Sequence, residues 1–196
     1  MTQDWQVTAI ETPKTASKIG RPNAASSDNR SFVFLPITHV RQEHLLCAPT
    51  SASMVLLHYG VRMPPQKVKQ LANSVATDKS FSGTYFKDIT GGLQSAGLRW
   101  KERGFPTNAK GFSDGLAEIE KSLRRGYPVT IDTLVPPDGH TAVVNGNDPT
   151  RKLISIADPT NPAPGLRRLS NAEFERLWRS VIANIRGCIL TAPPVR

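Results

Sequence analysis

The hydrophobic pattern of the chain changes from a mainly helical to a strand-like period near Tyr127, and this change restricts the fold class more than any other feature. Before Tyr127 apolar residues recur at helical spacing, and after it they alternate in short strand-like segments. Helices gathered in the first part and strands in the second favour an α+β fold. The 196 residues suffice for one domain with a sizeable core and leave little room for a second.

Four helices are expected in the first part of the chain. The first begins near Cys47, because Pro49 is tolerated only in a first turn, and it ends at Gly60. The other three are expected after Pro64-Pro65, over residues 84–96, and from a cap at Ser113 to Gly126.

Strands are expected mainly in the second part, although a short apolar run over residues 32–35 precedes the helices. Ser170 to Glu173 form a capping box that opens a fifth, short helix. Sixteen prolines and 14 glycines, with a proline-rich loop over 159–164, imply many turns and exclude a simple helical bundle. The other expected strands cover residues 98–103, 128–135, 140–146, 153–157 and 181–190.

The first 30 residues are polar and lack a sustained apolar period. They are expected to form a flexible arm, so that residues 31–196 make up the single domain. No run approaches the roughly eighteen apolar residues that span a bilayer, so no membrane span is expected. The N-terminus also lacks a secretory signal pattern. The protein is therefore cytoplasmic, or it has lost its signal, or it is exported by another address, for instance as a secreted effector.

The formal net charge of +9 suggests an anionic partner such as a cell-wall polymer, a membrane surface or a nucleic acid. A solvated basic surface is the simpler interpretation. The arginines are scattered without interleaved aromatic residues, so nucleic-acid binding is not expected. No cofactor or metal is expected either, because the spacing of His44, Cys47, His140 and Asp158 fits no standard zinc pattern.

Cys47 lies at the junction of a loop and a helix, the position most informative about chemistry. Unpaired backbone N–H groups and the positive end of the helix dipole favour the thiolate there, and the thiolate is the nucleophilic form. The alternative is a small buried hydrophobe, as expected for Cys188 in the apolar segment 185–190. Two cysteines do not make a disulfide framework, although one bridge between them is conceivable.

His140 and Asp158 belong to two strand-like segments separated by the turn signal Asn147-Asp148-Pro149-Thr150. A hairpin that turns near Pro149 places the two residues opposite each other on one face, roughly 5 Å apart at Cβ. A carboxylate bonded to one ring nitrogen fixes the imidazole and leaves the other nitrogen for a thiol proton. A slip of one residue would separate them, and a satisfied structural histidine beside an Asp-Pro turn remains the alternative.

Gln42 precedes Cys47 by five residues. Its side-chain amide and the backbone N–H of Cys47 are candidates for an oxyanion hole. The chain order of Gln42, Cys47, His140 and Asp158 is that of papain-like enzymes, and residues 40–180 resemble their bacteriocin-processing, double-glycine-leader peptidase branch. The resemblance depends on Gln42, Cys47-Ala48-Pro49-Thr50-Ser51, Tyr59-Gly60, Gly126-Tyr127-Pro128-Val129, Gly139-His140-Thr141-Ala142-Val143-Val144 and Ile156-Ala157-Asp158-Pro159.

This resemblance implies a cysteine peptidase in which an N-terminal helical part carries the nucleophile and packs on a C-terminal antiparallel sheet. It implies Cys47 as nucleophile, His140 as general base, Asp158 as orienting residue and Gln42 as oxyanion donor. The chain departs from the family pattern at Ala48, where glycine is usual. It also lacks the membrane exporter to which leader-processing members are fused, so a leader peptide cannot be assumed as substrate.

The expected function is therefore a thiol hydrolase that cleaves a peptide or isopeptide amide bond through an acyl-enzyme. A transglutaminase or a cell-wall amidase with the same triad, and an inactive papain-like domain that binds peptides, are the alternatives. His44 is a rival base, and Asn161 is a substitute orienting residue if Asp158 points away.

Overall fold

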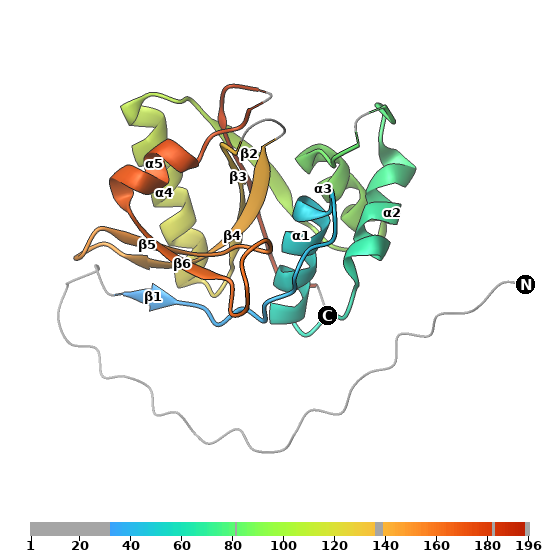
Figure 1. Cartoon of the computed structure of the whole chain (residues 1–196), viewed down its shortest axis with the longest axis horizontal. Coiled ribbons are helices and arrows are strands. Elements are labelled where there is room, and N and C mark those ends of the chain that lie inside the picture. The colour runs from blue at the N-terminus through green and yellow to red at the C-terminus, as the bar shows by residue number, and fades with distance from the viewer. Residues whose placement is uncertain (1–31, 81, 136–138, 182, 195–196) are drawn as a thin grey trace, which may run out of the picture.

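The computed structural model describes residues 32–194 except 81, 136–138 and 182. The expected arm over residues 1–30 lies outside this part. The described chain is an α+β fold in which an antiparallel sheet carries helices on both faces (Figure 1). The α+β prediction is therefore confirmed. None of the helices in the described part is long and apolar enough to cross a bilayer.

The sheet has seven strands, and all of their pairings are antiparallel. Its main path runs in the order β2-β7-β3-β4-β5-β6, and β1 pairs with β4 off this path. Strands from both ends of the chain thus meet in one sheet, with β4 near its centre. The strands are β1 (Val33–Phe34), β2 (Lys101–Phe105), β3 (Val129–Thr133), β4 (His140–Asp148), β5 (Leu153–Ala157), β6 (Leu166–Ser170) and β7 (Arg186–Leu190).

The helices form two groups, one on each side of the sheet (Figure 1). The first group packs around a core with Met54, Leu56 and Ile89, and the second around a core with Phe174 and Trp178. The helices of the first group are α1 (Cys47–His58), α2 (Pro65–Val75) and α3 (Phe86–Ser95), and those of the second are α4 (Ala109–Arg124) and α5 (Asn171–Leu177).

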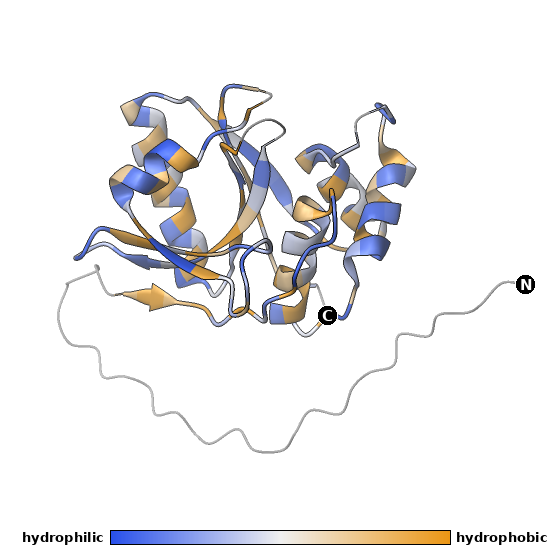
Figure 2. Ribbon diagram, in the orientation of Figure 1, coloured by the Kyte–Doolittle hydropathy of each residue, from blue (hydrophilic) through white to orange (hydrophobic). Residues whose placement is uncertain are grey.

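Helix α1 is buried along most of its length, because it contacts β4 on one side and α2 on the other. Residues 48–56 are all buried, including Thr50, Ser51 and Ser53. Helix α2, by contrast, buries only Val68 and Ala72 and is mostly hydrophilic in Figure 2. The helix that begins at Cys47 is therefore held rigidly between the sheet and a solvent-facing helix.

The expected cap of the fourth helix is wrong. Helix α4 begins one turn earlier, where the side chain of Asn108 accepts a hydrogen bond of 2.8 Å from the N–H of Gly111. Ser113 lies inside the helix. Gly111 is required there because a Cβ atom would come within 2.1 Å of the carbonyl oxygen of Pro106.

Several strand predictions are also corrected. Strand β6 was not predicted, because its exposed Arg167 and Arg168 hide the strand pattern on the edge of the sheet. Strand β2 begins later than expected, since Leu98 and Trp100 turn into the core. The last strand covers only Arg186–Leu190 of the expected 181–190. The first two helices, the segment 153–157 and the capping box of Ser170 with Glu173 are confirmed.

Candidate active site

Cys47 is the first residue of α1 and is partly exposed. It follows a tight turn in which the N–H of Leu46 donates to the carbonyl of Glu43 at 3.2 Å, and Leu45 adopts a left-handed φ of 60°. No side chain caps the helix, so its first N–H groups remain available around the sulfur. The sulfur therefore lies at the positive end of the helix dipole.

His140 is the first residue of β4 and meets Asp158 just beyond the end of β5. Its Nε2–H donates to Oδ1 of Asp158 at 2.8 Å, and the two side chains are only 10% and 5% exposed. The same Oδ1 accepts bonds from the N–H and the hydroxyl of Thr160, at 2.9 and 2.6 Å. Because Nε2 is occupied by the carboxylate, Nδ1 is the nitrogen left for Cys47.

The register of the β4–β5 hairpin corrects the expected one. The strands pair Asp148 with Leu153, so the turn is centred between Thr150 and Arg151 and not near Pro149, and His140 has no directly opposite partner in β5. The register shifts by one residue at Asn145, between Val144 and Gly146. Without that bulge, Asp158 would lie on the face of the sheet opposite to His140. With the bulge, both side chains lie on the same face, as diagonal neighbours on adjacent strands.

The ionisation of the three groups is coupled. Burial alone would raise the pKa of Cys47, but the hydrogen bond to His140 and the charge of that ring outweigh burial and lower it. Burial would lower the pKa of His140, yet bonds to Asp158 and Cys47 raise it to about 9. Burial likewise opposes ionisation of Asp158, and bonds from His140 and Thr160 hold its pKa well below the usual range. At neutral pH these shifts favour a thiolate beside an imidazolium.

Gln42 is fixed to the same loop as Asp158. Its backbone N–H donates to the carbonyl of Pro159 at 3.0 Å, and its side-chain Oε1 is buried with no partner among the described residues. A buried carboxamide with unused hydrogen-bonding capacity is uncommon in folded proteins. The side chain of Gln42 thus has an unpaired hydrogen-bonding group just before the turn that leads to Cys47.

Other candidate residues have structural roles or none. His44 is exposed in the turn, and both ring nitrogens of His58 lie against backbone carbonyls, at 3.2 and 3.0 Å. Cys188 is fully buried and unpaired, and burial raises its pKa to about 12. Asn161 is not needed as a substitute, because Asp158 faces His140. Among the described residues, no three His, Cys, Asp or Glu side chains are grouped closely enough to hold a metal ion.

Several supporting contacts were missed in the sequence. His39 Nε2 donates to the backbone carbonyl of Asp158 at 3.1 Å, and Ser51 Oγ donates to the carbonyl of Thr141 at 3.1 Å. Arg167 lies 3.5 Å from Oδ2 of Asp158. The bonds from Thr160 to Asp158, described above, could have been expected from the sequence, because Asp-Pro-Thr is a typical local turn in which the aspartate binds residues just after it. The others depend on contacts between distant segments.

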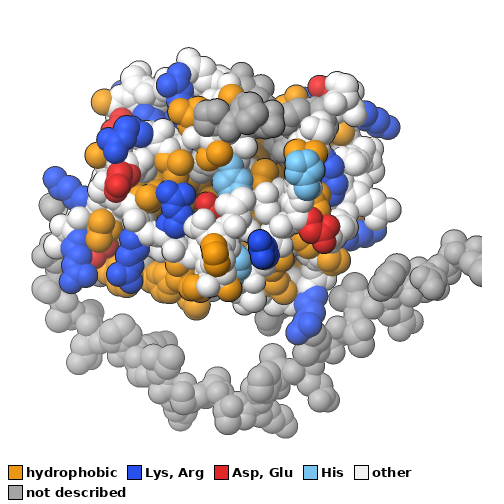
Figure 3. Space-filling view, in the orientation of Figure 1, with side chains coloured by type: hydrophobic (Ala, Val, Ile, Leu, Met, Phe, Trp, Pro, Cys, Tyr) orange, Lys and Arg blue, Asp and Glu red, His pale blue; other side chains and the backbone are white. Residues whose placement is uncertain are grey.

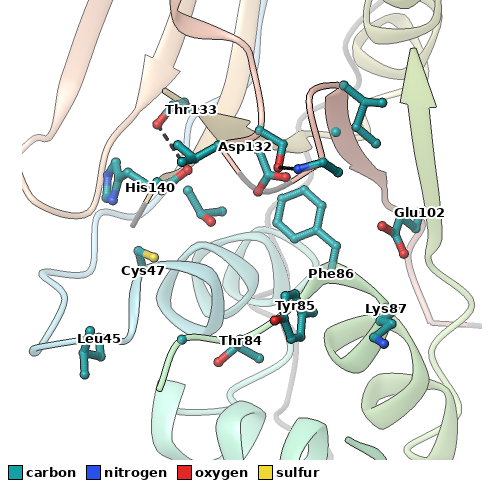
Figure 4. Close-up of a pocket in the computed structure, with 18 of the residues that line it drawn as sticks. Leu45, Cys47, Thr84, Tyr85, Phe86, Lys87, Glu102, Asp132, Thr133 and His140 are labelled. Atoms are coloured by element: carbon teal, nitrogen blue, oxygen red, sulfur yellow. Dashed lines mark hydrogen bonds between the residues drawn. The ribbon is translucent and has the colours of Figure 1, made fainter. Parts of the chain in front are cut away.

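A pocket opens beside Cys47 and His140, between α3 and the sheet. Figure 4 shows the sulfur of Cys47 and the ring of His140 on one side of it and Phe86 and Glu102 farther along. Its remaining wall includes Leu45, Tyr85, Asp132, Val181 and Ile185. On the surface, Lys and Arg side chains lie at several separate places on the face in Figure 3.

The Peptidase_C39 like family model matches residues 34–183. No protein of curated function matches the sequence. Among solved structures, the fold is similar to a C39-like protein of Bacillus anthracis (TM-score 0.61, 16% identity, covering 85% of this chain and 100% of that one). It is also similar to the peptidase domain of Streptococcus ComA, a bifunctional ABC transporter involved in quorum sensing (0.58, 20%, covering 79% and 96%).

A third similar structure is a double glycine motif protease from an AMS/PCAT transporter in complex with the leader peptide. Its TM-score is 0.57 at 19% identity, over 82% of this chain and 94% of that one. These likenesses establish a common papain-like fold, as the sequence motifs around Cys47 and His140 had indicated.

Proposed function

Because the chain belongs to the Peptidase_C39 like family, whose model matches most of its length, we propose that it is a cysteine peptidase that hydrolyses a peptide or isopeptide amide bond. In this proposal Cys47 is the nucleophile, His140 the general base and acid, Asp158 the orienting residue and Gln42 an oxyanion donor. The observation that carries it is the bond of 2.8 Å between His140 Nε2 and Asp158 Oδ1, with Cys47 coupled to the same ring.

The reaction begins with attack of the Cys47 thiolate on the substrate carbonyl carbon. The carbonyl π electrons move to oxygen, and the resulting tetrahedral species collapses as the amine leaves with a proton from Nδ1 of His140. Water then gives a proton to His140 and attacks the thioester, which releases the acid and restores the thiolate. Asp158 stays ionised throughout and holds the imidazolium in place.

The oxyanion is stabilised in this proposal by the backbone N–H of Cys47 and the side chain of Gln42. The free N–H groups at the start of α1 favour negative charge. The carboxamide of Gln42 is anchored at the adjoining loop, and rotation of about 180° about its last torsion exchanges its oxygen for its NH₂ donor. Ala48, which stands where glycine is usual in the family, also has a backbone N–H, so the substitution removes no backbone donor from the start of α1.

The pocket and one related structure support a proposed substrate class. A related protease of the same fold is found in complex with a leader peptide. The pocket beside Cys47 is open on one side and has both apolar and polar walls, as an extended peptide requires. A peptide is therefore the proposed substrate, without restriction to double-glycine leaders.

The test is digestion of a random peptide library, read by mass spectrometry. New termini are expected with the wild type and with Cys188→Ala, and none with Cys47→Ala or His140→Ala. Cys188→Ala is the matched control, because it removes the other thiol. Addition of an amine such as methylamine distinguishes hydrolysis from transfer: new free carboxyl termini support a hydrolase, and methylamine incorporated into glutamine side chains without backbone cleavage supports a transglutaminase. Cleavage that survives Cys47→Ala would refute the proposed nucleophile.

A further inference from the structure

Strands β2, β3 and β7 each contribute to the wall of the pocket beside Cys47, and two glycines are paired across β2 and β7. Gly104 of β2 lies opposite Gly187 of β7. A Cβ atom on Gly187 would lie 2.7 Å from Oδ2 of Asp132, and one on Gly104 would lie 2.8 Å from Cδ1 of Ile185. The absence of a side chain at Gly187 leaves room for the carboxylate of Asp132 in the pocket, and its absence at Gly104 leaves room for Ile185.

Two carboxylates line this pocket. Asp132 projects from β3, and Glu102 from β2, where Figure 4 shows it on the far side of the ring of Phe86. In the described part of the chain, no Lys, Arg or His lies within 4 Å of either carboxylate. Both groups thus face the cavity with no protein cation at ion-pair distance, although the chain as a whole has a net charge of +9.

Burial without a protein cation at ion-pair distance disfavours the ionised form of both carboxylates. Burial, followed by the neighbouring charge of Glu102, raises the pKa of Asp132 to about 7, against a hydrogen bond to Ser180. Burial also raises the pKa of Glu102, although Lys87 opposes it. A positive charge brought into the pocket would relieve both effects, because an opposite charge nearby favours the ionised carboxylate.

The remaining walls suit the stem of a long basic side chain. Phe86, Val181 and Ile185 are apolar and line the same pocket, and Figure 4 shows the ring of Phe86 between Cys47 and Glu102. Lysine and arginine side chains place their methylene groups on apolar surface and their charged ends on polar groups. A small neutral residue would leave the carboxylates unpaired, and an acidic residue would be repelled.

We propose that this pocket is a subsite for a lysine or arginine side chain of the peptide substrate, close to the cleaved bond, with Asp132 as the main specificity determinant and Glu102 as a second one. The inference rests on the proposed peptidase function for its place in the reaction. The geometry itself, an acidic pocket next to a reactive thiol, is independent of the bond that is cleaved.

The experiment compares wild type, Asp132→Asn and Glu102→Gln on the same random peptide library at pH 8, above the pKa of Asp132 of about 7. Asp114→Asn is the control, because Asp114 is an exposed acid on α4. Wild type and control are expected to enrich Lys or Arg at one position near the cleaved bond. Asp132→Asn should reduce that enrichment by about tenfold, as expected when ~1.4 kcal/mol of discrimination is lost. Thermal melting checks that each variant is folded.

A second measurement does not require proteolysis. The thiol of Cys47 is labelled in a Cys188→Ala background with two small reagents, cationic 2-aminoethyl methanethiosulfonate and anionic 2-sulfonatoethyl methanethiosulfonate. The ratio of the cationic to the anionic labelling rate is expected to fall in Asp132→Asn and in Glu102→Gln but not in Asp114→Asn. Glu102→Gln keeps this test valid if the more buried Asp132 does not tolerate substitution.

The outcomes separate the two proposals. Cleavage without a preference for Lys or Arg, or with a preference that Asp132→Asn leaves unchanged, would overturn the subsite and leave the peptidase intact. If the wild type cleaves nothing, the peptidase proposal fails, and the labelling ratio alone decides the subsite. A ratio that falls in the two pocket variants supports it, and an unchanged ratio overturns it.

Discussion

Ser51 donates a buried hydrogen bond of 3.1 Å to the backbone carbonyl of Thr141. Ser51 lies one turn along α1 from Cys47, and Thr141 directly follows His140 in β4. This bond therefore ties the helix that carries the thiol to the strand that carries the imidazole. The neighbouring carbonyl, that of His140 itself, accepts a hydrogen bond of 3.1 Å from Thr133 Oγ1 on β3.

Ser51→Ala is predicted to lower kcat more than its effect on stability would suggest. Loss of one buried hydrogen bond costs about 1 kcal/mol of unfolding free energy, but here it also loosens the distance between sulfur and imidazole. The matched control is Ser53→Ala: Ser53 is also buried on α1 and also donates to a backbone carbonyl, that of Met63, away from the site. Denaturation and peptide cleavage are measured for both. Equal losses of kcat would contradict a positioning role for Ser51.

The pH dependence of cleavage is predicted to be bell-shaped. Attack requires the thiolate, so activity falls below the lowered pKa of Cys47. Departure of the amine requires the protonated ring, so activity also falls as the pH rises through the His140 pKa of about 9.

Asp158→Asn should move the alkaline limb of this profile to lower pH. The carboxylate raises the pKa of His140, and a neutral amide cannot do so to the same degree. The profile of kcat/KM is recorded for wild type and variant. An alkaline limb that Asp158→Asn leaves in place would show that another group controls it.

Lys69 is predicted to hold one wall of the pocket in place. Its Nζ on α2 donates to the carbonyls of Ser82 and Gly83 and to the hydroxyl of Thr84, and these residues line the pocket. Lys69→Met should raise KM about tenfold, the factor that corresponds to ~1.4 kcal/mol of binding, with a smaller change in kcat. Lys67→Met is the control, since the ammonium of Lys67 on the same helix bonds to exposed Gln70 and, among the described residues, to no part of the pocket. A loss confined to kcat would contradict this role.

Gly187→Ala is predicted to disturb the pocket at Asp132 with little effect on the thiol. The added Cβ would lie 2.7 Å from Oδ2 of Asp132, so the carboxylate must move. Cleavage of peptides with a basic residue near the bond should fall, while labelling of Cys47 by neutral iodoacetamide is retained. Peptide kinetics and labelling rates are measured on the same preparation, and parallel loss of both would indicate general damage to the site.

The parts of the fold that depend on local signals were predictable from the sequence. Pro49 and Gly60 bound α1, and Ser170 with Glu173 cap α5, because each acts within a few residues. The start of α4 was misplaced, because Ser113 is a typical capping residue, whereas the actual cap is Asn108, which binds the N–H of Gly111. Edge strand β6 was missed, since exposed arginines mask its alternation.

The same distinction holds for the site. The candidate residues Cys47 and His140 stand at element starts that local patterns reveal, whereas the meeting of His140 with Asp158 depends on a bulge at Asn145 that no local pattern indicates. The predicted register misplaced the turn and lacked the bulge. These two errors cancelled, so the prediction still placed His140 and Asp158 on one face. Asp132 and Glu102 became neighbours of the site only through the β2-β7-β3 order of the sheet.

The rate at which iodoacetamide alkylates Cys47 at pH 6 tests the thiolate–imidazolium pair most directly. An unperturbed cysteine with a pKa near 8.5 is almost entirely protonated at that pH. Wild-type Cys47, in a Cys188→Ala background, should react at least about tenfold faster than free cysteine, and His140→Ala should abolish the difference. A rate no higher than that of free cysteine, or one that is unchanged in His140→Ala, would contradict the account.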